Sequence, residues 1–435
     1  MAESGDRRPP GEEGAGASNG AISIIQRGNL KALEQTLRKQ WRLGQNIVLC
    51  WSADERGLLV IFVPHYFLGN YCADDAEHRG NEGFIRELIS GRRRKQRDEL
   101  FAICERLGVA PTFIKLNTAL VEEPVLLHEV EQLIRRYGIS YVEDRAVLLF
   151  DIVEFSLYTP FEQASQLNSL SYSLNSAYNK LLAQGIEINF ARTTTGDGYY
   201  VWNRGLGADA NVDLFSFLVL VVADNAVARA QSRGNTVPVI RAAYHIGGHY
   251  ELYQAEGVNP TVFSYIVGDV TIELARIVDL ASPNQVLVGD FTTMGSFGLQ
   301  AHVPVSSPAF VAACNRGLSA VRGSQLSSKT VEQIDCRLSS YQDLDGHSKP
   351  LRLRFTDKHG LTHNAFNLEV DIRLDGGQLQ LGVPYPPPDD APPLAGSPEA
   401  DTTAVKPAPP AASVEDLIDD LAGVLHRRGG HNAES

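Results

Sequence analysis

The chain contains 435 residues, with a formal net charge of −13 and a hydrophobic fraction of 43%. The length fits two or three domains, and the hydrophobic fraction excludes a chain that is disordered throughout. The acidic balance argues against nucleic-acid binding, which needs a basic face, but it is compatible with a small polyanionic ligand in a local site.

Three features predict a cytoplasmic protein. The strongest apolar run, residues 214–222, is shorter than the roughly 20 residues of a membrane-spanning helix, so no membrane segment is expected. The polar first 20 residues lack the apolar core of a secretory signal. The five cysteines are scattered and form no CxxC pair, which is typical of free thiols in a reducing compartment.

The N-terminal third divides into three predicted segments. Residues 1–20, rich in Gly, Glu, Ala and Pro, are expected to be disordered. Residues 21–111 predict an α/β region with a helix in NLKALEQTLRKQWRLG and strands in NIVLCWS and GLLVIFV, and a regulatory or dimer-supporting role is the natural hypothesis for it. Residues 112–141 predict a helical lead-in, because EEPVLLHEVEQLIRRY has apolar residues at helical spacing.

A basic run, RRRKQR at residues 92–97, is predicted to lie on a charged helix. A solvated helix face is the simplest interpretation, and a local basic patch for a polyanion is the alternative.

The most informative stretch is residues 142–371, where Asp151 interrupts the apolar run RAVLLFDIVEFS. A carboxylate near the end of a buried strand is unfavourable unless it is paired, hydrogen-bonded or bound to a metal. The backbone N–H groups of the turn that follows can hold phosphate oxygens. A helix is expected from Pro160 until Gly185 ends it.

A second carboxylate, Asp197, lies in the Gly-Asp-Gly turn between the predicted strands IEINFARTT and YYVW. Strand, helix and hairpin make half of a ferredoxin-like βαββαβ sheet, so the sequence predicts an α+β fold. If its first two strands lie side by side, Asp151 and Asp197 come together. Two such carboxylates repel each other, and two divalent cations that serve a triphosphate explain them best, although Asp197 alone could simply be a turn residue.

Four motifs in order carry a resemblance to a known family. FDIVEF, TTGDGYYVW, VIRAAYHIGG and FSYIVGDVTIELARIVDLASPNQVLVG resemble the catalytic domain of the class III nucleotidyl cyclases, the adenylate and guanylate cyclases. The resemblance covers about residues 142–290. It implies a cyclase catalytic domain over residues 142–371.

The resemblance also implies roles for individual residues. Asp151 and Asp197, with the backbone carbonyl of Ile152, would hold two Mn²⁺ or Mg²⁺ ions. Arg276 would stabilise the transition state, and its alternative is a surface helix arginine. Arg241 would bind phosphate, and its alternative is a salt bridge at the strand edge.

Further nucleotide-binding candidates are Phe155, in the turn after Asp151, and Lys358, which lies one position away from the family's phosphate-binding lysine. Family active sites lie between two catalytic domains, one supplying the aspartates and the other the arginine. This chain has one recognisable copy, so a homodimer with two sites is implied.

The sequence departs from the family where purines are recognised. Thr193 replaces a lysine, and Tyr265 replaces an aspartate or threonine. Ile272 stands at the position of the transition-state asparagine, and Glu154 at that of a glycine. Arg192 could donate to a pyrimidine carbonyl, or it could form a sheet-face salt bridge.

This combination resembles the pyrimidine cyclases of the bacterial Pycsar anti-phage systems. We therefore expect a cyclase that converts UTP to 3′,5′-cyclic UMP and pyrophosphate, a signal that a separate effector protein reads. The alternatives are a cytidylate cyclase, a purine cyclase with divergent base contacts, and a catalytically inactive module that senses a nucleotide.

The C-terminal part is expected to contribute no core. Residues 372–412 predict a Pro-rich linker. Residues 413–428, SVEDLIDDLAGVLHRR, predict an amphipathic tail helix for docking or oligomer formation.

Overall fold

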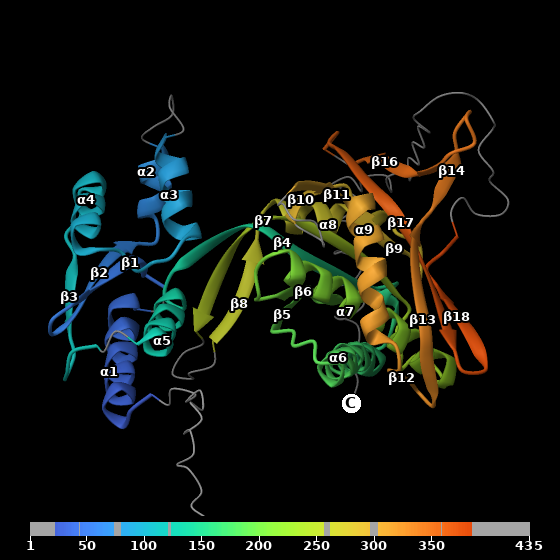
Figure 1. The fold of residues 1–435 in the computed structure, drawn as a ribbon, viewed down its shortest axis with the longest axis horizontal. Helices are drawn as coiled ribbons and strands as arrows, with labels where there is room; N and C mark the ends of the chain where they lie inside the picture. The colour runs from blue at the N-terminus through green and yellow to red at the C-terminus, as the bar shows by residue number, and fades with distance from the viewer. Residues whose placement is uncertain are drawn as a thin grey trace, which may run out of the picture.

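The computed structural model describes residues 22–42, 44–73, 80–120, 123–255, 262–295, 303–357 and 359–384 (Figure 1). The predictions for residues 1–20, for Lys358 and for the tail helix at 413–428 lie outside the described residues.

The N-terminal region is a small sheet covered on both faces by helices. Strands β1 (Asn46–Asp54), β2 (Gly57–Pro64) and β3 (Thr112–Lys115) pair antiparallel in that order. The cores on its two faces come from different helices: α1 (Ile24–Trp41) and α5 (Pro124–Arg135) on one, and α2 (Phe67–Ala73), α3 (Gly80–Ser90) and α4 (Arg97–Leu107) on the other. Both strands predicted in this region are confirmed, and β3 extends the sheet beyond residue 111.

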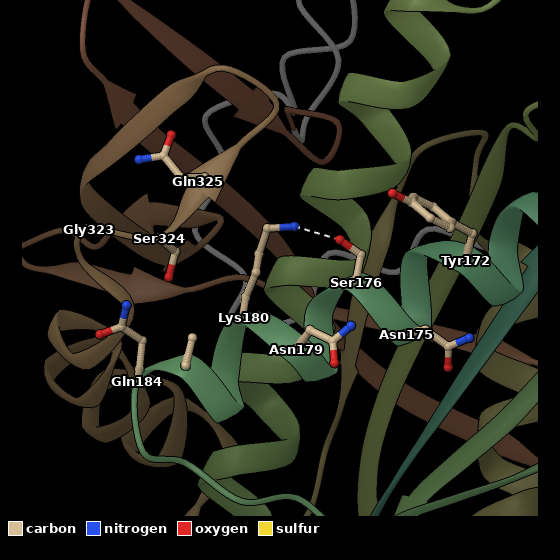
Figure 2. Close-up of a pocket in the computed structure, with 10 residues that line it drawn as sticks. Tyr172, Asn175, Ser176, Asn179, Lys180, Gln184, Gly323, Ser324 and Gln325 are labelled. Atoms are coloured by element: carbon tan, nitrogen blue, oxygen red, sulfur yellow. Dashed lines mark hydrogen bonds between the residues drawn. The ribbon is translucent and has the colours of Figure 1, made fainter.

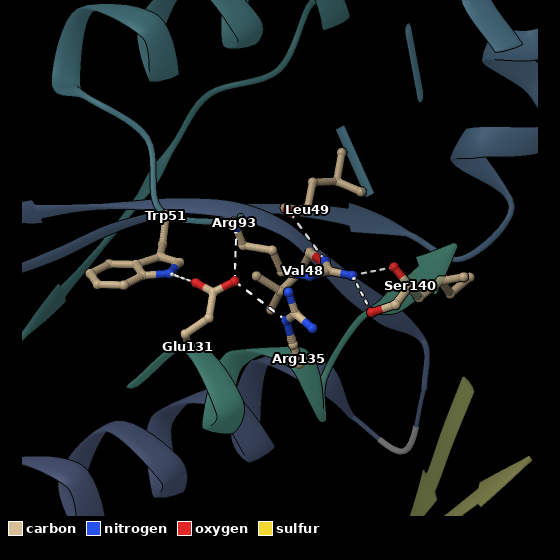
Figure 3. Close-up of polar contacts among 8 residues, drawn as sticks. Val48, Leu49, Trp51, Arg93, Glu131, Arg135 and Ser140 are labelled. Carbon is tan, nitrogen blue, oxygen red and sulfur yellow. Dashed lines mark hydrogen bonds and ion pairs between the residues drawn. The ribbon is translucent and has the colours of Figure 1, made fainter. Parts of the chain in front are cut away.

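The basic run at residues 92–97 is not on a helix, so that prediction was wrong. Most of it is the connection between α3 and α4, which starts only at Arg97. Arg93 is completely buried, and its guanidinium donates to the carbonyls of Val48 and Leu49 on β1 (Figure 3). It also donates to the Ile139 carbonyl and the Ser140 hydroxyl on β4. Charge composition alone could not reveal a buried arginine that backbone carbonyls satisfy.

The central sheet has the predicted βαββαβ connectivity. Its six elements are β4 (Ile139–Ile152), α6 (Pro160–Ala183), β5 (Phe190–Thr194), β6 (Gly198–Asn203), α7 (Ala208–Gln231) and β7 (Ile240–Ala255). The strands run antiparallel to their neighbours in the order β7-β4-β6-β5. The expectation that the first two strands lie side by side was therefore wrong, because β6 lies between β4 and β5. The mixed sheet fits the α+β class.

The same sheet continues past β7. Strand β9 (Val286–Gly289) pairs parallel with β7, and β17 (Thr362–Leu374) and β13 (Lys329–Leu338) follow antiparallel. The remaining elements are β8 (Val262–Val267), α8 (Asp269–Leu280), β10 (Thr292–Gly295), β11 (Val303–Ser306), α9 (Ser307–Gly317), β12 (Gln325–Leu326), β14 (Ser340–Gln342), β15 (Ser348–Pro350), β16 (Arg352–Thr356) and β18 (Gly377–Leu381). Residues 372–381, expected in the linker, complete β17 and form β18, because the Asp-Gly-Gly turn at 375–377 closes a hairpin.

The two faces of the sheet are covered by different helices. Helices α6, α7 and α9 form the main core on one face, and α8 packs against a smaller apolar cluster on the other (Figure 1). By length and composition α7 could cross a membrane, which the short apolar run did not indicate. Two thirds of its apolar window is buried, as in the core helix of a globular domain.

A buried cluster of charged and polar side chains joins β4 to β7 at Arg145. Arg145 Nη1 lies 3.0 Å from Glu251 Oε2 and 3.4 Å from His249 Nε2, and all three side chains are almost fully buried. Burial, with the charge of Arg145 second, lowers the pKa of His249 to about 4. His249 is therefore neutral in the folded protein at pH 7.

The free energy of unfolding should consequently fall in mild acid. An unfolded histidine has a pKa of about 6.5. Between pH 6.5 and about 4, His249 is therefore protonated in the unfolded chain but remains neutral in the folded chain. Stability from this residue is complete above pH 6.5, and on the order of 3 kcal/mol is lost as the pH falls to about 4. Urea unfolding at pH 4.5, 5.5 and 7 measures this slope. It should flatten in His249→Gln and persist in His347→Gln, whose ring is exposed; an unchanged slope in His249→Gln contradicts the assignment.

Candidate active site

The site begins at the C-terminal end of β4, where the Asp151 residue is 9% exposed. Along this strand Phe150 points into the core under α6 and α7, and Leu149 points into the cluster under α8. Strand alternation therefore directs Asp151 to the α8 face. Asp151 is paired in register with Arg241 on β7 and with Gly198 on β6.

The structure brings Asp197 beside this strand end. Asp197 lies on the turn between β5 and β6, and its carbonyl accepts a 3.0 Å hydrogen bond from the Ile152 N–H. The pairing is close, because a Cβ added at Gly198 would lie 1.9 Å from the Phe150 carbonyl oxygen. Gly196 has φ +104°, a conformation that favours glycine. The two glycines thus allow the turn that places the two aspartates together, although the neighbouring strand is β6 and not β5.

Arg241 is the third charged group of the site, and it contacts Asp151. Its Nε lies 2.6 Å from Asp151 Oδ2, and its Nη1 donates to the carbonyls of Asp279 and Ala281 at the end of α8. Burial raises the pKa of Asp151, the Arg241 guanidinium opposes that rise, and the charges of Asp197 and Asp279 add to it. Asp279 was not predicted as a site residue. Asp279 follows Arg276 closely on the same helix, which was the available sequence signal. Helix periodicity, however, does not show which strand the end of a helix approaches.

These residues fit a divalent cation. Two further carboxylates, those of Asp197 and Asp279, add to the negative potential around Asp151, while the structure shows one arginine in direct contact with it. Carboxylate and carbonyl oxygens are the ligands that Mg²⁺ and Mn²⁺ prefer. Asp151, Asp197 and the carbonyl of Ile152 would therefore hold the ion from one protomer.

The turn after β4 has an unusual backbone. Glu154, which stands where the resembled family has glycine, adopts a left-handed conformation with φ 55° and ψ 30°. A non-glycine residue there carries a strain on the order of 1 kcal/mol. Phe155 follows in a short 3-10 turn and packs against the main core. Glu154 thus holds a backbone conformation that glycine would adopt without strain.

The candidate base-reading residues divide between the two sheet faces. Thr193 is paired with Tyr200, whose hydroxyl donates to the Thr271 carbonyl on α8, so Thr193 lies on the α8 face. Arg192 lies on the opposite face, where its Nη1 donates to Ser171 Oγ on α6 and its guanidinium stacks over Tyr199. The structure therefore brings Thr193, but not Arg192, to the face of the two aspartates.

Ile272 exposes apolar surface near that face, whereas Tyr265 lies on the opposite side of β8, because its neighbour Ile266 belongs to the cluster under α8. Tyr265 on β8 is 39% exposed, and Ile272 in the first turn of α8 is 53% exposed. Strands β5 and β8 contact each other, which brings the element of Thr193 near that of Tyr265. The role of Tyr265 in base recognition stays a prediction.

Arg276 does not join the aspartates within one chain. Its Nε forms an ion pair with Asp357 at 3.2 Å, at the end of β16. Among the described residues, no ion pair or hydrogen bond connects it to Asp151 or Asp197. Within the chain, the predicted metal ligands and the predicted transition-state arginine are thus separate groups.

No family model and no curated protein matches the sequence, but solved structures do. The guanylate cyclase domain of RhGC from Catenaria anguillulae in complex with GTP has 10% identity and a TM-score of 0.30, and the match covers 53% of this chain and 97% of that one. The adenylyl cyclase CyaB from P. aeruginosa has 14% identity and a TM-score of 0.30, with 53% and 95% covered. A dimeric guanylyl cyclase domain of RhoGC from Blastocladiella emersonii has 14% identity and a TM-score of 0.28, with 36% and 89% covered.

All three are nucleotidyl cyclases or cyclase domains. Their identities and TM-scores are too low to assign an activity to this chain. The chemistry therefore has to follow from the residues of the site.

Two other polar features do not compete with this site for a triphosphate. The open hollow in Figure 2, of about 430 Å³, lies between α6 and β12 and is lined mainly by amides and hydroxyls. Its one cation, Lys180, is already bound by Asp224 and Ser176. The exposed group Asp343, Asp345 and His347 closes the turn between β14 and β15 through backbone hydrogen bonds.

Proposed function

We propose that this protein is a nucleotidyl cyclase, which joins the 3′-hydroxyl of a nucleoside triphosphate to its α-phosphate and releases pyrophosphate. One observation carries the proposal: a 3.0 Å hydrogen bond from the Ile152 N–H to the Asp197 carbonyl holds the turn of Asp197 beside the end of β4, where its charge acts on Asp151. Acidic residues gathered around one arginine suit a metal–triphosphate complex better than they suit a structural core.

The residues then have distinct roles. Asp151, Asp197 and the Ile152 carbonyl would hold two Mn²⁺ or Mg²⁺ ions, which when bound acidify the 3′-hydroxyl and neutralise the triphosphate. Arg241, held by the Asp279 and Ala281 carbonyls, can turn its guanidinium from Asp151 to a phosphate oxygen. Phe155, and Lys358 outside the described residues, remain candidates for further nucleotide contacts.

The proposed enzyme is a homodimer in which each site takes Arg276 from the partner. The separation of Arg276 from the aspartates within one chain supports this arrangement. So do the exposed apolar side chains of Val267, Ile272 and Leu280 on β8 and α8, which a partner would cover.

Mixing two strongly impaired variants tests the shared site. Asp197→Asn removes a metal ligand and Arg276→Ala removes the arginine, so each homodimer should keep only a small residual rate. Random exchange of subunits makes about half of the dimers mixed, each with one intact site, and about one quarter of the wild-type rate should return. Sedimentation velocity confirms that dimers form. A mixture that stays at the residual rate of the two homodimers although its subunits exchange contradicts sharing.

For the substrate we propose UTP, with cyclic UMP as a cytoplasmic alarm signal in anti-phage defence that a separate effector reads. Support comes from Thr193 and Tyr265, which replace the polar pair that recognises purines in the resembled family. A tyrosine narrows a base pocket and leaves room for one ring. Because Arg192 faces α6, the proposal depends on Thr193 and Tyr265 and does not need Arg192.

The direct test incubates purified protein and Mn²⁺ with ATP, GTP, CTP and UTP separately and identifies products by mass spectrometry. Cyclic UMP as the main product supports the full proposal. Cyclic CMP, or a cyclic purine nucleotide alone, corrects the substrate but keeps the reaction. No cyclic product from any of the four overturns the proposed reaction.

The second candidate function is a nucleotide sensor without catalysis. The exposed Ile272, at the position of the resembled family's asparagine, favours it, because an apolar side chain cannot hydrogen-bond to the reacting ribose. A sensor would bind a triphosphate in calorimetry without turnover. Measuring triphosphate binding and cyclic product formation on the same sample therefore distinguishes the two functions.

A further inference from the structure

A buried carboxylate on the hairpin that joins β16 to β17 holds the side chain of Arg276. Asp357 Oδ2 lies 3.2 Å from Arg276 Nε, and the Asp357 side chain is only 6% exposed. Arg276 itself is 27% exposed at its side chain. The pair joins α8 to a hairpin 81 residues later in the chain, so it is a long-range contact that local structure does not require.

The hairpin's own backbone holds the Asp357 side chain independently of Arg276. The Asp357 Oδ1 atom accepts hydrogen bonds from the N–H groups of His359, at 2.8 Å, and Leu361, at 3.0 Å. The other oxygen, Oδ2, is buried and has no hydrogen-bond partner among the described residues, so Arg276 Nε contacts it as an ion pair. Although burial favours the neutral acid, these hydrogen bonds and nearby charges lower the pKa of Asp357, so the group is an anion at neutral pH.

His363 makes a second connection between the same two elements. Its Nδ1 lies 2.9 Å from Glu273 Oε2 on α8, and its Nε2 lies 3.5 Å from Asp357 Oδ2. The ring is almost fully buried and stacks on Phe355. Glu273 and Arg276 are one helical turn apart, so the hairpin holds α8 at two neighbouring points.

The way Arg276 is held leaves its reactive end available. Asp357 engages Nε, and among the described residues neither Nη group has an ion-pair or hydrogen-bond partner. An ion pair at Nε restrains the arginine side chain and leaves its two Nη groups for a ligand, and parallel N–H groups of this kind suit phosphate oxygens.

We propose that Asp357 and His363 are positioning residues that fix the Arg276 guanidinium for the triphosphate of the partner subunit's site. This inference rests on the proposed cyclase function and extends it to a pair that the sequence motifs did not reveal. Without Asp357 the long arginine side chain would sample several rotamers, and the transition state would have to order it.

A double-mutant cycle tests the inference in the full-length protein. Asp357→Asn, Arg276→Ala and the double variant are compared for kcat and KM with the triphosphate that the wild type uses. We expect Asp357→Asn to lower kcat by about tenfold or more, with KM changed less than threefold. In the Arg276→Ala background the same change should lower the remaining rate by less than twofold, because no arginine is left to position.

The matched control is the ion pair of Arg352 and Asp290, which joins the same atom types, Nε and Oδ2, at the same 3.2 Å. Asp290→Asn should leave kcat within twofold. A second variant, His363→Gln, should lower kcat in the wild-type background and not in Arg276→Ala. The inference is overturned if Asp357→Asn lowers the rate equally in both backgrounds, which would mean a structural role only.

The failure of the function and of the inference can be told apart. If the wild type forms no cyclic product, the proposed function fails, and the affinity for UTP with Mn²⁺ becomes the readout. Asp357→Asn should then weaken binding at least threefold while Asp290→Asn does not. Equal affinities, or no binding by the wild type, overturn the inference.

Discussion

Replacing Asp151 with asparagine is expected to lower cyclic nucleotide formation on the order of 1000-fold. Asparagine keeps the size of the side chain and one acceptor oxygen, but it removes the negative charge that would hold a divalent ion beside Asp197. Such an ion contributes several kcal/mol to the transition state, and each 1.4 kcal/mol is a factor of ten in rate. Initial rates with Mn²⁺, measured by product mass spectrometry, give the factor.

The control variant is Asp144→Asn on the same strand. Its carboxylate accepts hydrogen bonds from Thr293 Oγ1 and the Met294 N–H, far along β4 from the site. This variant should keep the wild-type rate. Thermal unfolding of both variants shows whether a loss of rate is a loss of fold. An Asp151→Asn protein that is folded and retains more than a tenth of the rate would show that this carboxylate is not a metal ligand.

The aspartates could be predicted from the sequence because their signals are local. An apolar run that ends in Asp151, and a Gly-Asp-Gly turn at Asp197, each determine a strand end within a few residues. Which strand lies beside β4 could not be predicted, since alternating β5 and β6 look equally suitable as neighbours. The prediction that the carboxylates meet stood despite the wrong pairing, because Asp197 lies on the turn shared by β5 and β6.

Long-range charge pairs were the part of the site that the sequence did not reveal. Asp357 and Arg276 are 81 residues apart, and nothing in either segment indicates the other. Arg192 shows the reverse case, because it is next to Thr193 on the same strand, alternation alone directs it to the opposite face, and the structure agrees. Periodicity thus predicts the face on which a residue lies, and only packing of the whole chain determines its partner.

The same limit explains Arg93, which lay in a basic run and turned out to be central to the fold. Replacing it with methionine is expected to lower the free energy of unfolding by about 3–5 kcal/mol. Methionine fills similar volume but leaves four acceptors on Val48, Leu49, Ile139 and Ser140 without their donor. Urea unfolding followed by tryptophan fluorescence measures the loss, because Trp51 donates to Glu131, which also accepts from the Arg93 N–H (Figure 3).

Arg92→Met is the matched control, because this neighbouring side chain is exposed, and its effect should stay within about 0.5 kcal/mol. Gly138→Ala tests the hydrogen-bonded surroundings of Arg93 while the arginine charge is kept. A Cβ there would lie 2.6 Å from both Arg93 Nη1 and the Val48 carbonyl, so it should also destabilise the protein, whereas Gly83→Ala meets nothing within 4 Å and should not. If Arg93→Met unfolds like Arg92→Met, its hydrogen bonds do not stabilise the fold.

Arg93 also determines how the N-terminal region relates to the site. Its guanidinium joins β1 to the first two residues of β4, and the same strand ends at Asp151. Loss of this connection should separate one cooperative unfolding transition into two, with the N-terminal sheet melting first. A single transition in Arg93→Met would mean that other contacts between α3 and β4 suffice to couple them. Two transitions would show that an arginine far from the aspartates makes the N-terminal region part of the same folding unit as the strand that carries Asp151.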